Sequence, residues 1–126
     1  MTRTVRTDYY YYIYSNDEND MLWYSPSSDD KTKCDRNLLN CIEEARRILR
    51  RQPDADIEIN AHYCDMCGEY EDGDEGTFTV CLASELDQVE EKIRKEMRKL
   101  KKSQQRKMQE KKIKRRELKR IKRRGF

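Results

Sequence analysis

The sequence predicts an α+β fold in the order ββαββα, with a small antiparallel sheet, helices on it and a long basic C-terminal helix. Three observations predict it. Four stretches have the apolar and aromatic patterns of strands, two stretches repeat apolar residues every three or four positions, and the charge changes sign near the start of the last helix. With 126 residues, 35% of them apolar and 42% charged, the chain suits one domain with a small core.

The first two strands are predicted as a hairpin. Residues 4–15 are dense in β-branched and aromatic side chains, SNDEND supplies turn residues, and MLWYS forms the second strand. Alternation divides the first strand into two sets, which are Tyr9, Tyr11 and Ile13 on one face and Tyr10, Tyr12 and Tyr14 on the other. One set should fill the core. The other is covered by the long helix or left as an aromatic platform, which suits stacked bases, a dimer interface or ordinary packing.

The middle of the chain is predicted to contain a helix followed by a second strand pair. Apolar residues recur at three- and four-residue spacing over residues 35–51, which predicts an amphipathic helix ended by Pro53. Residues 56–64 and 77–82 alternate apolar and polar side chains, which predicts the third and fourth strands. The acidic stretch between them, residues 65–76, is expected to be a loop.

The last helix is predicted to begin at Ser84, because a serine followed three residues later by Asp87 is a capping signature. An apolar stripe suited to docking on the sheet follows, formed by Leu86, Val89, Ile93, Met97 and Leu100. Beyond this stripe, residues 101–124 hold 14 Lys or Arg and no Gly or Pro. We therefore expect an acidic α+β body over residues 1–100 and a basic helical arm over residues 101–126.

The two parts of the chain carry opposite charge. Residues 1–91 contain nine Lys or Arg and 22 Asp or Glu, a net charge of −13, whereas residues 92–126 contain 19 Lys or Arg and three Glu, a net charge of +16. Such asymmetry is typical of a protein whose tail binds nucleic acid or an acidic partner. Self-association of arm with body would have the same pattern.

The arm predicts a non-catalytic protein that binds RNA, DNA or a ribonucleoprotein. Crowded like charges weaken an isolated helix, and phosphates that neutralise them would order it. The residues expected to contact phosphates are Lys101, Lys102, Arg106, Lys107, Lys111, Lys112, Lys114, Arg115, Arg116, Lys119, Arg120, Lys122, Arg123 and Arg124. An acidic protein partner and a solvated, localisation-signal-like helix are the alternatives for this segment.

The acidic body supports a second hypothesis from a different class. A net charge of −13 over 91 residues would suit a small viral or phage accessory protein, an inhibitor or adaptor that mimics nucleic acid and occupies the basic channel of a protein partner.

The sequence AHYCDMCGEY contains a CxxC pair, Cys64 and Cys67, which supplies half of a structural zinc site. His62 or Cys34 would have to add further ligands, and two reduced thiols are the alternative to one bound zinc. A redox role is disfavoured because the pair ends a predicted strand beside carboxylates, which raise a thiol pKa. The nearby acidic stretch lacks the twelve-residue spacing of an EF-hand.

Catalysis is not predicted, because His62 is the one histidine, no phosphate-binding glycine loop occurs and no nucleophile has a recognisable base beside it. No apolar stretch reaches the roughly 20 residues of a membrane span. The N-terminus lacks the features of a signal peptide. The odd number of cysteines, five, favours reduced thiols or thiolate ligands over a framework of disulfides. We therefore expect a protein of the cytoplasm, that of the host cell if it is viral, without a membrane partner.

Overall fold

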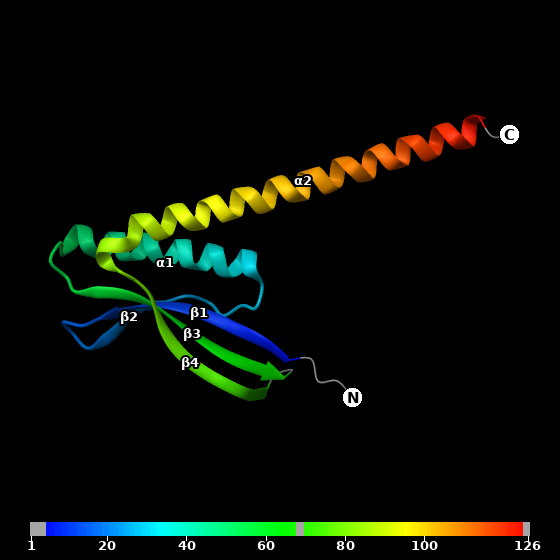
Figure 1. Ribbon diagram of the computed structural model, residues 1–126. Helices are drawn as coiled ribbons and strands as arrows, with labels where there is room; N and C mark the ends of the chain where they lie inside the picture. The colour runs from blue at the N-terminus through cyan, green and yellow to red at the C-terminus, as the bar shows by residue number, and fades with distance from the viewer. Residues whose placement is uncertain (1–4, 68–69, 125–126) are drawn as a thin grey trace. The chain divides into compact units, whose positions relative to one another are not determined.

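The computed structural model describes residues 5–67 and 70–124, and it confirms the α+β class and the predicted order of elements. The elements in chain order are β1 (Val5–Ser15), β2 (Asp20–Tyr24), α1 (Lys31–Arg51), β3 (Ile57–Cys67), β4 (Tyr70–Leu82), a 3₁₀ turn (Ala83–Glu85) and α2 (Leu86–Arg124), as Figure 1 shows.

The four strands form one antiparallel sheet in the order β2-β1-β3-β4. The central pair, β1 and β3, is in unbroken register from Val5 opposite Cys67 to Ser15 opposite Ile57. Irregularities interrupt both outer pairs, one between β1 and β2 and two between β3 and β4. The regular central pair therefore fixes which side chains share a face of the sheet.

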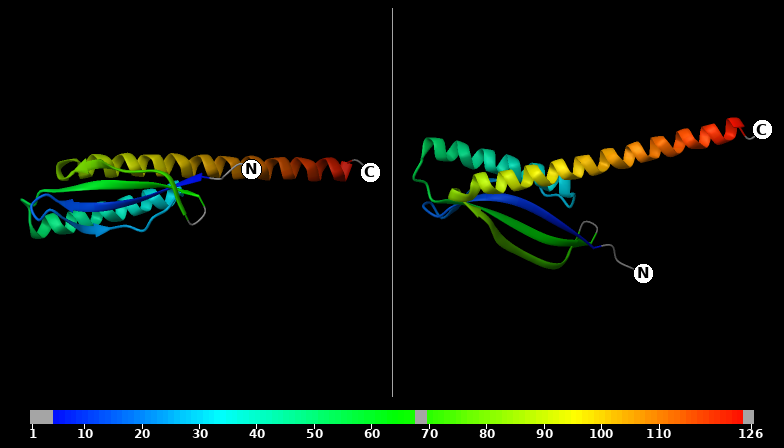
Figure 2. Two further views of the ribbon diagram at one scale, coloured as in Figure 1. Left: turned by 90° about the horizontal axis from the view of Figure 1, so that it is seen from below. Right: turned by 45° about the horizontal axis from the view of Figure 1, so that its top comes forward.

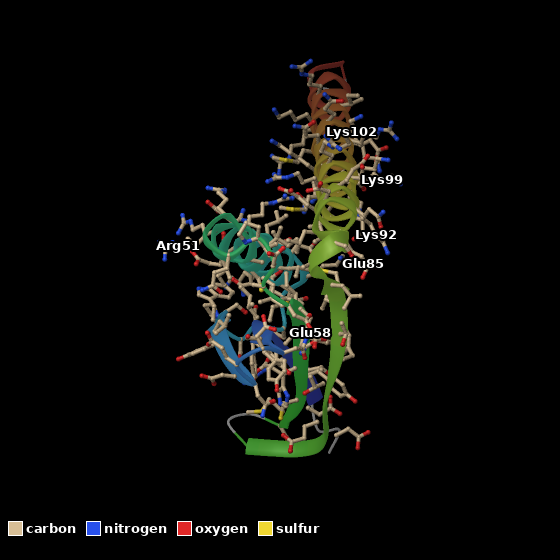
Figure 3. All side chains as sticks on the ribbon, turned by 90° about the vertical axis from the view of Figure 1, so that its left-hand side faces the viewer. Arg51, Glu58, Glu85, Lys92, Lys99 and Lys102 are labelled. Atoms are coloured by element: carbon tan, nitrogen blue, oxygen red, sulfur yellow. The ribbon has the colours of Figure 1, made fainter. Side chains whose placement is uncertain are left out.

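The core lies between this sheet and the helices. Ile13 on β1, Ile59 on β3, and Cys41 and Ile42 on α1 are at most 1% exposed. Within the unit that ends at Ile93, α1 and the first turns of α2 lie on the same side of the sheet (Figures 1 and 3). The predicted set containing Ile13 is therefore the one that faces the core.

Helix α1 begins at Lys31, four residues before the predicted start. The side chain of Asp30 accepts a hydrogen bond from the Thr32 amide at 2.8 Å and so caps the first turn. This early turn carries Cys34 and Asp35, which are both buried, while the predicted end at Arg51 is confirmed.

The prediction of an acidic loop over residues 65–76 was wrong for its described part, because β3 continues to Cys67 and β4 begins at Tyr70. Pairing with β1 extends the ladder and outweighs the poor strand propensity of Asp and Glu. At Gly73 the backbone φ is +135°, and an added Cβ would lie 3.0 Å from the Asp65 Cβ. Glycine is thus required where β4 passes Asp65, which itself accepts a hydrogen bond from Thr7 at 2.7 Å.

The predicted serine cap of the last helix was also wrong. A 3₁₀ turn precedes α2, and the Glu85 carboxylate accepts a hydrogen bond from the Leu82 amide at 3.0 Å. Asp87 does not cap the helix but forms an ion pair with Arg46 of α1, with 2.7 Å between its carboxylate and the guanidinium. The Glu90 carboxylate lies 2.5 Å from the same guanidinium. These two ion pairs tie the first turns of α2 to α1.

The chain divides into one compact unit that ends at Ile93 and a second that begins at Arg94. Leu86 and Ile93 of the predicted stripe are buried, whereas Leu100 is 41% exposed. The predicted division between residues 100 and 101 stays a prediction. Across the described parts of the chain, no helix combines the length and apolar character needed to cross a membrane.

Removing a buried branched side chain from the centre of the sheet should destabilise the body. Ile59→Ala should lower the free energy of unfolding by about 2–5 kcal/mol, because it leaves a cavity in a layer that is closed on both sides. Urea denaturation followed by circular dichroism measures this. Ile113→Ala is the matched control, because Ile113 is 55% exposed and its loss should leave the transition of the body unchanged.

Alkaline pH should destabilise the fold. Burial raises the pKa of Cys41 from 9.0 to about 12 and that of Cys81 from 9.0 to about 11, so both thiols stay protonated in the folded chain at a pH where the unfolded chain ionises. The contribution of these two thiols to the free energy of unfolding is therefore complete below about pH 9, and it is lost as the pH rises toward 12. Urea unfolding at rising pH measures the loss, and Cys41→Val should reduce it. Constant stability across this range would contradict the prediction.

Candidate nucleic-acid interface

The predicted binding residues lie on α2, whose 39 residues form one continuous helix (Figure 2). Lys, Arg, Glu, Gln, Met and Leu are all good helix formers, and the segment after Leu100 contains mainly these residues and no Gly or Pro before residue 125. This composition explains why the helix persists where the apolar stripe stops. At 1.5 Å per residue, residues 101–124 span about 35 Å.

The basic side chains of the arm are open to solvent. The predicted phosphate-binding residues whose side chains the structure describes are all exposed, and they are Lys101, Lys102, Arg106, Lys107, Lys111, Lys112, Lys114, Arg115 and Arg116. Of the remaining predicted residues the structure describes the helical backbone, and their side chains lie outside the described part: Lys119, Arg120, Lys122, Arg123 and Arg124.

Positive charge surrounds the arm on almost every side. At about 100° per residue, the basic positions of residues 101–124 point in all directions except along one narrow line. Ser103, Glu110 and Glu117 occupy that line at seven-residue spacing. Side chains leave the helix around its circumference, with Lys99 and Lys102 among them (Figure 3). Such a helix can bind negative groups on two opposite sides at once, as it would meet them in a groove.

The arm also contains little negative charge of its own. Glu110 and Glu117 are the two acidic residues of residues 101–126, against 14 Lys or Arg. Pairs of like charge, such as Lys111 with Arg115, stand four residues apart and repel by a few tenths of a kcal/mol each. A polyanion that neutralises these pairs therefore stabilises the helix as it binds.

The structure places the predicted zinc ligands on different elements. His62 and Cys64 share one face of β3, and Cys67 falls on the other face by strand alternation. Cys34 lies in the first turn of α1, where its thiol donates to the Ser28 carbonyl at 3.2 Å. Among residues 6–67 and 73–116, whose side chains the structure describes, no three His, Cys, Asp or Glu form a group that could hold a metal ion. The zinc site stays a prediction.

A second surface lies on the sheet face opposite the helices. Tyr10 is the centre of its aromatic contacts, with ring centroids 6.1 Å from Tyr12 and 5.0 Å from His62. His62 in turn lies 3.2 Å from the Thr77 hydroxyl through its Nδ1 atom. The sequence predicted the tyrosine set, and the alternation of β3 placed His62 away from its buried residues. It could not show that His62 and Thr77 lie beside Tyr10, because this depends on strand order.

Comparison of the chain with protein-family models, curated proteins and solved structures finds no match.

Thiol reactivity should separate the cysteines into two classes. All five are without a disulfide, and Cys64 and Cys67 are half-buried whereas Cys34, Cys41 and Cys81 are buried. Burial raises the pKa of each buried thiol, so a thiolate-specific reagent at about pH 8 should modify two residues rapidly and three slowly. Mass spectrometry of the modified peptides identifies them.

The same assay tests the zinc prediction. A stoichiometric zinc complex should protect Cys64 and Cys67 from the reagent, and Cys64→Ser should abolish the protection. Equal labelling with and without zinc would contradict a metal site at this pair.

Proposed function

We propose that the protein is a non-catalytic nucleic-acid-binding protein whose C-terminal basic helix binds the phosphates of RNA, DNA or a ribonucleoprotein. One observation carries the proposal. The helix continues without a break past the last apolar position of its stripe, and every basic side chain described between residues 101 and 116 is exposed. A segment that contributed to the core would bury some of these residues.

The density of charge on the arm fits a nucleic acid. Fourteen basic residues over about 35 Å give one positive charge per about 2.5 Å of helix axis. Double-stranded DNA carries one negative charge per about 1.7 Å of its axis. Acidic protein segments seldom present such a regular and dense array, and the arrangement of charge around the helix suits a groove with phosphates on both sides.

The body would direct this binding to the arm. Its net charge of −13 over residues 1–91 repels phosphates, so a polyanion approaching the protein is steered to the other end of the chain. Lysines and arginines that contact phosphates add affinity without reading base edges, so weak sequence preference is expected. The body is then available for a second component.

The proposal predicts a defined change in salt dependence. Replacing Lys111, Lys112, Arg115 and Arg116 with Gln should reduce the log-log slope of affinity against salt by about 3, because each lost phosphate contact contributes about 0.7–0.9. Fluorescence anisotropy with labelled RNA and DNA of several sequences measures the slope. Affinity should fall by similar factors for all sequences, while thermal unfolding of the body stays unchanged.

A matched variant controls for net charge. Arg36, Arg47, Arg50 and Arg51 are exposed residues of α1, and their replacement with Gln removes the same four charges from the body. This variant should bind with nearly the parental slope. If the two variants lose equal affinity, the effect is one of net charge. If neither loses affinity, the arm does not bind nucleic acid, and the hypothesis of an acidic body that binds a basic partner gains support.

A further inference from the structure

The sheet face opposite the helices is rich in aromatic side chains. Tyr10, Tyr12 and Tyr14 are half-buried there, and Tyr24, which pairs with Tyr12, is 69% exposed. Two adjoining hollows of about 400 and 330 Å³ share Tyr10 and Met21. We call this surface the tyrosine face. Its hollows extend from the β1–β2 hairpin to His62 and Thr77 on the other two strands.

The surroundings of the tyrosine face are acidic. The four strands contain eight Asp or Glu but one Lys or Arg, which is Arg6 and is paired with Asp8 at 3.2 Å. Asp20 lines one hollow, and the Glu75 carboxylate lies 3.8 Å from His62 Nε2. Burial, Tyr12 and Glu75 together raise the pKa of Tyr10, which is consistent with this negative environment.

A buried polar atom of this face has no partner. Asn60 lies between Tyr12 of β1 and Thr79 of β4, on the same side of the sheet as the tyrosines, and is 8% exposed. Among the described residues, no group donates to its Oδ1 atom. A buried acceptor without a donor is costly, so the packing around Asn60 stores an unfavourable contact on this side of the sheet.

We propose that the tyrosine face binds the basic arm of a second copy of this chain. Aromatic rings attract ammonium and guanidinium groups, and carboxylates pair with them. The rings of the face and the carboxylates of Asp20 and Glu75 thus both fit a cationic partner. The chain itself supplies such a partner, because residues 92–126 carry a net charge of +16 and residues 1–91 carry −13. A nucleic acid on this face would instead set its phosphates beside the carboxylates of Asp20 and Glu75.

This contact joins two different surfaces. Each copy that binds through its face still offers a free arm, and each that binds through its arm still offers a free face, so association continues head to tail unless a ring closes. The contact does not depend on the proposed function. Nucleic acid that occupies the arm would compete with it.

Two variants of the full chain test the proposal without nucleic acid. The arm variant replaces Lys111, Lys112, Arg115 and Arg116 with Gln. The face variant combines Tyr10→Leu, Asp20→Asn and Glu75→Gln, which keeps the bulk of the side chains but removes a ring and two charges. Sedimentation velocity at low salt over a range of concentrations should show association of the parent chain and association weakened by about tenfold or more in either variant.

Mixing the two variants gives the decisive result. The arm variant retains an intact face and the face variant an intact arm, so together they should form a 1:1 complex that grows no further. A mixture that stays monomeric overturns the proposal. So does an arm variant that associates as the parent does, since the tyrosine faces would then pair with each other. A parent chain that is monomeric at every concentration also overturns it.

Matched controls separate the contact from general effects. Tyr10→Phe keeps the ring and should associate as the parent does, whereas equal loss with Phe and Leu would contradict a role for the ring. Asp29→Asn with Asp54→Asn removes two exposed charges outside the strands and should leave association unchanged. Thermal unfolding checks that the face variant is folded. If that variant loses nucleic-acid binding while the arm variant keeps it, the face is a nucleic-acid surface and the proposal is wrong.

Discussion

The shortage of apolar side chains is the constraint on which the rest of the structure depends. With 35% apolar residues, the chain builds one buried layer, between a four-stranded sheet and its helices. That layer consists mostly of small and branched side chains such as Ile13, Ile59, Ala61 and Cys41. A second layer on the opposite sheet face would need another set of apolar residues. The chain instead places tyrosines there, whose rings give area for contact and whose hydroxyls tolerate water.

The same shortage explains the arm. Among the side chains of α2 that the structure describes, the buried apolar ones are Leu86 and Ile93, and after Leu100 the helix consists mainly of residues with high helix propensity. This part of the helix does not need to bury side chains in the core, so charged residues are tolerated around its whole surface. The arm and the tyrosine face, to which we assign binding, are thus both surfaces that no apolar layer covers. They differ in the sign of their charge.

Sequence patterns predicted the parts of the fold that depend on local periodicity. The order of elements follows from the spacing of apolar residues, and the end of α1 at Arg51 follows from Pro53. Alternation divided β1 into two side-chain sets, and the structure shows that the set with Ile13 faces the core. The patterns failed where long-range pairing decides. Residues 65–67 and 70–76 were expected to be a loop because of their carboxylates, but hydrogen bonding to β1 and across the hairpin holds them in strands. The cap of α2 was missed for a similar reason, since Asp87 pairs with Arg46 of α1.

The candidate sites divide in the same way. Exposed lysines and arginines on a continuous helix can be predicted from composition, because nothing distant determines them. The tyrosine face could not be predicted in full, since the neighbours of Tyr10 on β3 and β4 depend on strand order. Under the two proposals, nucleic acid and the tyrosine face of a second copy compete for the same arm. The density of negative charge on each decides which one binds. Nucleic acid presents a charge every 1.7 Å or so, in a continuous array. The four strands contain eight carboxylates in all, on both sides of the sheet, and several of them are engaged by Arg6, Thr7, Thr79 and His62. A polyanion should therefore displace the tyrosine face from the arm.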